Sequence, residues 1–459
     1  MIARHDYTVA FRALTPVHVG AAGADAVTDL PLATDGQGRL VIPGSSWAGV
    51  LRALSRAWLP GHVDDLFGPE PGAEDGRAGH LVIDDSALGP DVEIQARTGV
   101  GIDRRRAAAA TRLLYERMVL AAGTEVLLQL RYEGPAPEPA RQLVALVRAL
   151  GLRIGGASGR GLGRLECVSA TVREIDLDNR ASLLRALRGD GAPTDVTAAV
   201  GATSPLVRIE VSWTARRPVI VATGSPGESV DVVPSLTRSA TGTGLVPVLP
   251  GSSIRGVLRS TAEMVLRTVL PLDPPADDSV AIGDLREWAP AFEILFGSVD
   301  RAGALTVPDV GALADPVAPQ AWRSYLRTGA AAAGWHRERT HVALDRWTGG
   351  AAEHRLFTVG ETPGVAWAPI VLELDVARIP AERTRAVVVL LGTALALMRD
   401  GHIGFGRGTT RGLGEIVVGR VRLTGGETLG LPDLDTEDAL WPWLRAVAGG
   451  ARLEELMMT

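Results

Sequence analysis

The sequence Ile42-Pro-Gly-Ser-Ser-Trp-Ala-Gly-Val-Leu-Arg52 returns later in the same chain as Leu249-Pro-Gly-Ser-Ser-Ile-Arg-Gly-Val-Leu-Arg259. Four more blocks return in the same order: Pro16-Val-His-Val-Gly20 as Pro218-Val-Ile-Val-Ala222, Leu66-Phe-Gly68 as Leu295-Phe-Gly297, Ile102-Asp-Arg104 as Leu344-Asp-Arg346, and Arg160-Gly-Leu-Gly163 as Arg411-Gly-Leu-Gly414. Their offset grows along the chain, so residues are inserted between blocks and not within them. Five blocks in one order indicate a duplicated domain.

The composition is that of a globular chain. With 459 residues, 46% of them hydrophobic and 22% charged, the chain can bury two cores of ordinary size. Its single cysteine, Cys167, excludes an internal disulfide and a multi-cysteine zinc site, and it favours a reducing cytoplasm. The longest apolar run, residues 386–398, is too short to span a bilayer, so we expect a cytoplasmic protein with no membrane partner.

The charge balance limits how nucleic acid could be bound. The formal net charge is −6, whereas a large phosphate footprint usually requires a basic domain. All 47 positive side chains are arginine. Any RNA contact must therefore come from local arginine clusters.

Periodicity predicts the same order of elements in both halves. Residues 6–14 and 207–213 alternate polar and apolar side chains, as a half-buried strand does. After each Pro-Gly-Ser-Ser block the pattern becomes helical, over 47–59 and 254–270, with Ser45 or Ser46 and Ser252 or Ser253 as expected N-caps. A second helix (140–150 and 383–398), a glycine-rich loop and a strand close each half. This order predicts an α+β protein of two tandem ferredoxin-like (RRM-like) domains, each with one sheet face open.

The division along the chain follows from the repeats and from composition. We expect a first domain over 1–175 and a second over 206–424. Between them, residues 176–205 include a stretch rich in Gly, Ala, Pro and Thr that predicts a linker. Residues 425–459 are expected to form a helical tail.

Both halves carry a glycine-rich loop between a helix and a strand. A dinucleotide fingerprint requires the reverse order, a strand before and a helix after, so this type of site is excluded. Glycines can bring backbone N–H groups close to a phosphate, and nearby arginines can add charge. The candidate contacts are Gly156, Arg160, Arg407 and Arg411. The alternative is a tight turn that only glycine can form.

Arginines also mark two other segments. Residues 102–117 and 344–359 each read as two strands joined by a tip of small residues, which predicts a projecting hairpin. The candidate RNA contacts there are Arg104, Arg105, Arg112, Arg346 and Arg355, and those on the helices after the Pro-Gly-Ser-Ser blocks are Arg52, Arg56, Arg255 and Arg259 together with Ser45, Ser46, Ser252 and Ser253. The alternative is that such arginine runs are only solvated surface.

With these motifs in view, the chain resembles two fused members of the repeat-associated mysterious protein (RAMP) superfamily. More narrowly, it resembles the backbone subunit of type III CRISPR effector complexes (Csm or Cmr type). The residues that carry the resemblance are the Pro-Gly-Ser-Ser blocks, the Leu-Phe-Gly blocks, the Asp-Arg hairpins and the glycine-rich loops. It covers residues 6–172 and 206–424.

The resemblance implies RAMP domains whose thumb hairpins project between a guide crRNA and its target RNA, in a complex with other CRISPR effector subunits. In the family an aspartate in an Asp-x-Pro setting is needed to cut the target. Asp29-Leu-Pro31 fits directly, whereas Asp231-Val-Val-Pro234 has one extra residue, which weakens the second assignment. Either aspartate could activate the 2′-hydroxyl or hold a hydrated Mg²⁺ or Mn²⁺ without a dedicated metal cluster. Local competitors are Asp25, Asp35 and Glu228.

Three functions remain open at this point. The first is a guide-dependent RNA endonuclease that cuts at two successive sites and, as the resemblance implies, depends on a divalent ion. The second is a non-catalytic scaffold of the same fold that only holds crRNA. The third is a metal-independent nuclease that processes the guide, which would favour a histidine such as His18 and would work in EDTA.

Overall fold

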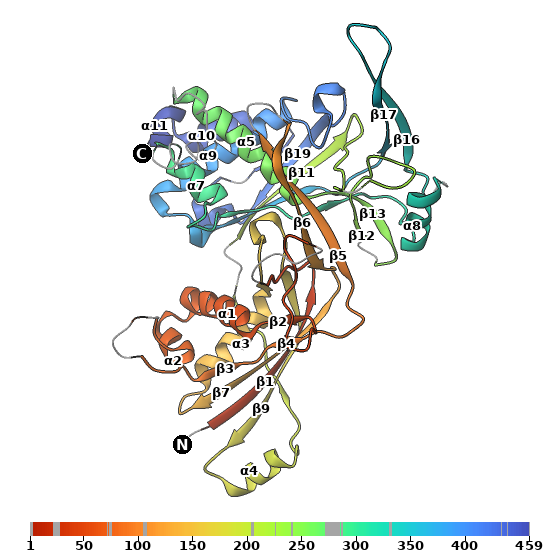
Figure 1. Cartoon of the computed structure of the whole chain (residues 1–459). Coiled ribbons are helices and arrows are strands. Elements are labelled where there is room, and N and C mark those ends of the chain that lie inside the picture. Colours follow the sequence, from red (N-terminus) through yellow and green to blue (C-terminus); the bar gives the residue numbers. More distant parts are fainter. Residues whose placement is uncertain are drawn as a thin grey trace. The chain divides into compact units, whose positions relative to one another are not determined.

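A computed structural model describes residues 3–21, 28–70, 72, 76–103, 108–202, 206–224, 226–239, 242–270, 285, 288–329, 333–432, 434–437 and 439–458 (Figure 1). The chain divides into two compact units. The first comprises Met1–Arg97, Tyr115–Ser158 and Leu162–Ser204, and the second comprises Thr98–Leu114, Gly159–Gly161 and Pro205–Thr459. No helix among the described residues has the length and hydropathy that crossing a membrane requires.

The described residues of the first half form a series of helices and strands. In chain order they are β1 (Ala3–Ala13), β2 (Val41–Ile42), α1 (Gly44–Trp58), α2 (Val63–Phe67), β3 (Leu81–Ile83), β4 (Ser86–Ala87), β5 (Ile94–Asp103), β6 (Ala108–Leu120), β7 (Glu125–Gly134), α3 (Glu138–Leu150), β8 (Leu152–Arg153), β9 (Arg164–Asp176), α4 (Arg180–Leu187) and β10 (Thr194–Asp195).

The second half repeats this order and extends it. Its elements are β11 (Leu206–Ala215), β12 (Leu236–Arg238), β13 (Leu245–Leu249), α5 (Gly251–Val269), α7 (Pro290–Phe296), β14 (Leu305–Thr306), β15 (Val310–Gly311), α8 (Pro319–Thr328), β16 (Arg337–Leu344), β17 (Ala351–Glu361), β18 (Ile370–Asp375), α9 (Thr384–Arg399), β19 (Ile416–Thr424), β20 (Leu434–Thr436), α10 (Leu440–Ala448) and α11 (Leu453–Met458).

Both sheets have the ferredoxin-like strand order that the sequence predicts. The first runs β9-β1-β7-β3, and the second runs β14-β18-β11-β19, with every neighbouring pair antiparallel. The predicted alternation is confirmed, because Tyr7, Val9 and Phe11 of β1 are buried while the residues between them are half-buried. In β7 the alternation is again strict, so only one face of the first sheet is covered.

The pairing of the central strands shows the duplication at the level of single residues. In β1 the register against β9 shifts between Ala10 and Phe11, and in β11 the register against β19 shifts between Val211 and Trp213. Phe11 and Trp213 lie 202 positions apart, the same offset as the blocks that begin at Pro16 and Pro218. Each central strand therefore carries an irregularity at the same place.

The helices after the Pro-Gly-Ser-Ser blocks begin earlier than predicted. The N-caps are Pro43 and Pro250, and no side chain caps either helix from within its own turn, so the predicted serine caps are wrong. Instead, a distant aspartate accepts the first helical N–H: Gly44 donates to Asp85 Oδ1 at 2.7 Å. Gly251 donates likewise to Asp309 Oδ1 at 2.9 Å. The Asp85–Asp309 pair is a sixth repeated feature that local patterns do not reveal.

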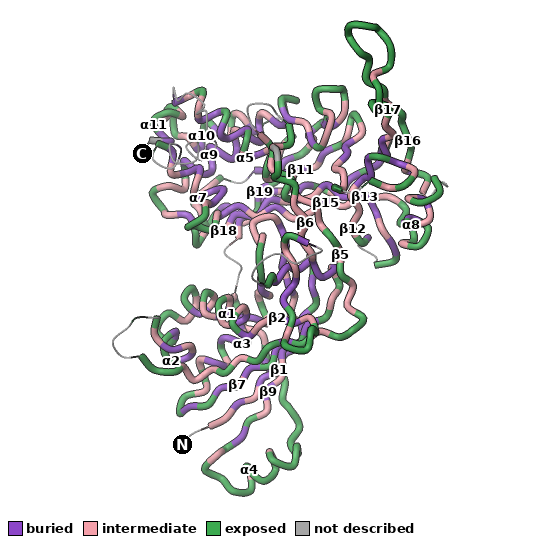
Figure 2. Tube along the Cα trace, in the orientation of Figure 1, coloured by how far each residue is buried: buried purple, intermediate pink, exposed green. Residues whose placement is uncertain are grey.

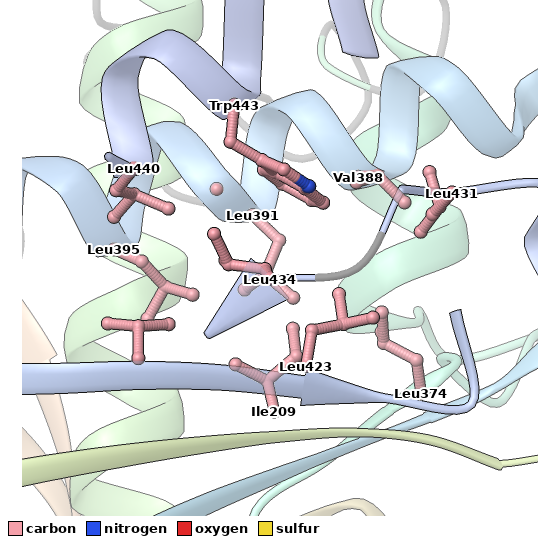
Figure 3. Close-up of a pocket in the computed structure, with 12 residues that line it drawn as sticks. Ile209, Leu374, Val388, Leu391, Leu395, Leu423, Leu431, Leu434, Leu440 and Trp443 are labelled. Atoms are coloured by element: carbon pink, nitrogen blue, oxygen red, sulfur yellow. The ribbon is translucent and has the colours of Figure 1, made fainter. Parts of the chain in front are cut away.

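Residues outside the two predicted domains also pack onto the units. β10, within the stretch predicted as a linker, pairs with β9, and Val196 is buried in the first core. In the tail, β20 pairs with β19. Figure 3 shows Leu440 and Trp443 of α10 facing α9 and the sheet across a cavity lined by apolar side chains. The lining is almost entirely apolar, and the Trp443 indole N–H already donates to Pro432 O, so this cavity is part of the core rather than a ligand site.

Candidate nucleic-acid interface

The loops that carry the two candidate aspartates are folded alike. Gly20 forms a bridge with Leu32 in the first half, and Ala222 forms one with Pro234 in the second. Ala33 N–H donates to Val19 O at 2.9 Å, as Ser235 N–H does to Val221 O at 2.7 Å. Each of these residues in the first half lies 202 positions before its counterpart in the second half, and Asp29 lies 202 positions before Asp231.

This register corrects the comparison made from the sequence. Pro31 corresponds to Val233, and Pro234 corresponds to Leu32, so no residue is inserted beside the second aspartate. The extra residues of the second loop lie later, between β12 and β13. The first half has a shorter turn there, closed by a bridge between Thr34 and Leu40. The two aspartates are equivalent by position in the fold.

Each aspartate is fixed by the second strand of the nearby hairpin. Glu116 N–H in β6 donates to Asp29 Oδ2 at 2.8 Å, and Thr358 N–H in β17 donates to Asp231 Oδ2 at 2.7 Å. Both aspartates are exposed, and within the described chain no hydrogen bond to either Oδ1 is present. Each site therefore presents one oriented carboxylate oxygen to solvent.

Next to each aspartate, the loop also pairs with the second hairpin strand, β6 or β17, through a single β-bridge. Leu30 pairs with Arg117 and Val232 pairs with Val359, both in the parallel sense. Thr28 Oγ adds a hydrogen bond to the carbonyl of Glu116 at 3.0 Å in the first half. The loop and the base of the hairpin thus form one structural element.

The competing carboxylates lie in different settings. Asp35 accepts the N–H groups of Gln37 and Arg39 and forms an ion pair with Arg39, and these hydrogen bonds, led by that from Arg39 N–H, lower its pKa. Asp35 is therefore a turn residue. Glu228 precedes the second aspartate by three positions, and Asp25 lies outside the described residues.

The hairpins form separate two-stranded sheets, β5–β6 and β16–β17. β16–β17 extends away from the body of the second unit, and most of its residues are exposed (Figure 2). In β6 and β17, Arg112 and His354 have positive φ of 62° and 55°, and they are 242 positions apart, as are Asp103 and Asp345. A non-glycine residue in this region is uncommon, so both hairpins share an irregular backbone near the tip.

The predicted arginines of the hairpins are only partly placed. Arg112, Arg346 and Arg355 are exposed, and the described structure gives none of them an ion pair. Arg104 and Arg105 lie outside the described residues. Asp345 closes the turn at the tip of β16–β17, because its Oδ1 accepts the N–H groups of Trp347 and Thr348, each at 2.8 Å.

The glycine-rich loops are tight turns packed against the segment before each aspartate. Gly156 N–H donates to His18 O at 2.8 Å, and Arg407 N–H donates to Ile220 O at the same distance. Gly163 and Gly414 have φ of 82° and 72°, and a Cβ there would lie 2.0 Å from Ile154 O and 2.1 Å from Phe405 O. Glycine is required here for the fold itself.

These contacts commit part of the loop to the protein. The Gly156 N–H is already used and cannot also contact a phosphate. Gly156 and Arg411 are exposed, and Arg160 is half-buried. Burial lowers the pKa of Arg407, with a smaller contribution from the charge of Arg411, so two cations lie close together on the second loop.

Four segments meet in one apolar cluster in the second unit. Ile220, Val232 and Val359 form its buried centre, and Phe357 and Leu413 pack on it. They come from the segment before the aspartate, the aspartate loop, the hairpin base and the glycine-rich loop. In the first half, His18 takes the place of Ile220, and its Nδ1 lies 2.7 Å from Met118 O.

His18 is therefore a packing residue. It is 6% exposed, and burial lowers its pKa, which leaves the ring neutral at pH 7. A buried neutral histidine whose counterpart is isoleucine is a poor proton donor to RNA. The geometry therefore does not support a metal-independent nuclease that processes the guide with His18.

The buried histidines predict how the first unit responds to pH. Burial lowers the pKa of both His5 and His18, so the unfolded chain binds protons more readily than the folded one below about pH 6.5. The free energy of unfolding should be maximal above that pH and should fall as the pH drops. In denaturant titrations at pH 5 to 8, H18I should lose less stability toward pH 5 than the wild type. An unchanged pH dependence would contradict this assignment.

The candidate arginines on α1 and α5 mostly bind the protein. Arg52 donates to Gly68 O at 2.8 Å, and Arg255 donates to Phe296 O, so both secure the Leu-Phe-Gly helix ends. Arg259 lies over the Phe292 ring at 5.5 Å, and Arg56 forms an ion pair with Glu70. Burial, reinforced by the charge of Arg259, lowers the pKa of Arg255 to about 10, so it stays charged at pH 7.

The candidate serines lie on the first turns of these helices. Ser45 and Ser252 are exposed, and Ser46 and Ser253 are half-buried. Because none of the four caps its helix, the hydroxyls are not committed by that role.

Comparisons with known proteins agree with the duplication. The family model described as the RAMP superfamily matches residues 10–166 and 218–417, one region in each half of the chain. No curated protein matches the chain. One solved structure that matches is the cryo-EM structure of the Type III-B Cmr-beta bound to cognate target RNA, at 13% identity and a TM-score of 0.31. The match covers 35% of this chain and 96% of that one.

Proposed function

Because the chain belongs to the RAMP superfamily, with one family region in each half, we propose that it is a backbone subunit of a type III CRISPR effector complex. In this proposal it binds guide crRNA and, together with other effector subunits, cuts complementary target RNA at two successive sites. The observation that carries the proposal is the equivalence of Asp29 and Asp231, each fixed by the backbone of a hairpin strand.

The chemistry requires few protein groups. The 2′-hydroxyl beside the scissile phosphate is an internal nucleophile, and the task of the protein is to orient it for in-line attack. A hairpin that displaces a base would free the backbone for this movement. The exposed Oδ1 of Asp29 or Asp231 could then accept the 2′-hydroxyl proton as the 2′-oxygen bonds to phosphorus. The bond from phosphorus to the 5′-oxygen breaks, which leaves a 2′,3′-cyclic phosphate and a 5′-hydroxyl whose proton comes from water.

A divalent ion fits the same groups. Among the described residues no three histidine, cysteine or acidic side chains are grouped to hold a metal. One oriented carboxylate oxygen at each site suits a hydrated Mg²⁺ or Mn²⁺, which keeps most of its waters. Such an ion would supply positive charge next to the phosphate.

Binding of the guide should depend mainly on contacts to the phosphates of the RNA backbone. Aromatic residues make up only 4% of the chain, and the candidate contacts for the guide are arginines and first-turn serines. Affinity for the guide should therefore fall with salt and vary little with guide sequence.

The direct test is to purify the chain with its partner subunits and a defined guide. The preparation should carry RNA, shown by its absorbance at 260 nm, and should yield two cuts in a complementary target. EDTA should stop both cuts without releasing the guide. RNA bound without any cutting would leave only the scaffold function, and a preparation free of RNA would refute the proposal.

Trp347 offers a second test, at the tip of β16–β17. Its side chain is 97% exposed, on a turn fixed by Asp345. An exposed indole can stack on an RNA base, which is worth about 1–3 kcal/mol. The fluorescence of Trp347, taken as the difference between the wild type and W347A, should be quenched by target RNA, and W347F should retain target affinity that W347A loses. An unquenched Trp347 would show that this tip does not contact RNA.

A further inference from the structure

The second half contains a helical insertion that the first half lacks. The offset between the halves is 224 at Asp85 and Asp309 but 242 at Asp103 and Asp345, so 18 residues are added between these points. The added segment includes α8. In the first half, residues 88–93, all of them described, join β4 to β5 without a helix.

Aromatic side chains anchor α8 to the residues that follow it. Trp322 and Tyr325 are 6% and 1% exposed. The Trp335 ring stacks on Trp322 with centroids 5.8 Å apart, and the His336 ring meets Tyr325 edge-on at 4.5 Å. The segment is therefore part of the hydrophobic core of the second unit and not a loosely attached loop.

The C-terminal end of α8 holds the second aspartate loop. Glu228 N–H donates to Leu326 O at 2.9 Å, and Ser229 Oγ donates to Tyr325 O at 3.1 Å. Gly227 also lies against this end, because a Cβ there would be 3.0 Å from Leu326 O. Asp231 follows Ser229 by two residues, so the helix fixes the chain immediately before the candidate carboxylate.

The same helix is tied to the hairpin. Tyr325 Oη donates to Glu338 Oε1 in β16 at 2.8 Å. Glu338 is in register with Gly360 of β17, two residues beyond Thr358, whose N–H binds Asp231. Burial raises the pKa of Tyr325 above its usual range, so the hydroxyl remains a donor at neutral pH. Tyr325 thus joins α8 to the strand pair that holds the carboxylate.

We propose that α8 is a brace that sets the position of Asp231 relative to the hairpin, with Ser229, Tyr325 and Glu338 as positioning residues. The inference rests on the proposed function, since it concerns the rate of the second cut. The first half has no counterpart of α8 between β4 and β5, where residues 88–93 are all described, so the two cuts in one target should respond differently to changes in α8.

The test compares both cuts within the complete guide-loaded complex. Y325F keeps the packed ring and loses the hydrogen bond, and E338A removes its acceptor. Each should slow the second cut about tenfold at saturating target, as expected for the loss of one hydrogen bond. The first cut, target affinity and the melting temperature should stay close to wild type. E338Q retains an acceptor oxygen and should restore the rate.

A matched variant in the first half provides the reciprocal control. T28A removes the side-chain hydrogen bond between Thr28 and Glu116 O, so it should slow only the first cut. Equal slowing of both cuts by Y325F, or no slowing, would overturn the brace. Persistence of the second cut in D231N would instead refute the proposed function, and the two failures can therefore be told apart.

Discussion

Replacing Asp29 with asparagine is expected to abolish the first target cut and leave the second, and D231N should do the reverse. Asparagine has the same shape, and its side-chain oxygen can still accept the N–H of Glu116 or Thr358. The loop should therefore stay in place while the charge and the proton acceptor are lost. Loss of a general base typically costs about 10²–10⁴-fold in rate. The measurement is a time course of both products from one end-labelled target.

The double variant decides between enzyme and scaffold. It should retain the guide and bind target with unchanged affinity while producing neither cut. Because each single variant keeps one working site, the remaining cut reports correct assembly in the same reaction. Two undiminished cuts in the double variant would mean that the aspartates only shape their loops.

The second large effect concerns stability and the glycine of the Pro-Gly-Ser-Ser blocks. A Cβ at Gly44 would lie 2.4 Å from Ile83 O, and one at Gly251 would lie 1.8 Å from Val307 O. Both obstacles are backbone atoms and cannot rotate away. G44A and G251A should each destabilise their unit by about 3 kcal/mol or more, since overpacking of this kind costs about 1–3 kcal/mol even where side chains can adjust.

The same helices contain a matched control. Gly49 in α1 and Gly256 in α5 have open space where a Cβ would be. G49A and G256A should stabilise the protein by about 0.5–1 kcal/mol, because alanine is the better helix former. Thermal unfolding of the four variants measures the difference. Equal effects of G44A and G49A would show that the close approach to Ile83 O is not a constraint.

Local patterns were sufficient for the elements of the fold. Alternation at residues 6–14 and 207–213 predicts β1 and β11, and helical periodicity predicts α3 and α9. The repeated order of the blocks then predicts two ferredoxin-like sheets, which the strand order confirms. These features depend on periodicities of a few residues that can be read directly along the chain.

The site depended on contacts between distant segments. Asp29 meets Glu116 across 87 positions, and Asp231 meets Thr358 across 127. The spacing between aspartate and proline differs by one residue between the two halves and suggested that the second loop is shifted. The bridges Gly20–Leu32 and Ala222–Pro234 show that both loops have the same register. Among the candidate arginines, Arg52 and Arg255 proved to bind carbonyl groups of the Leu-Phe-Gly helix ends.

The duplication, the order of the elements and the two candidate aspartates could be predicted from the chain's own pattern, because repetition and periodicity are visible along the sequence. The folded structure was needed to show that the aspartates are equivalent, that Asp85 and Asp309 accept the first helical N–H groups, and that α8 contacts the second aspartate loop. Hydrogen bonds between remote segments are set by how the sheets and loops pack. A donor in one block finds its acceptor far away in the sequence, where no local pattern marks it.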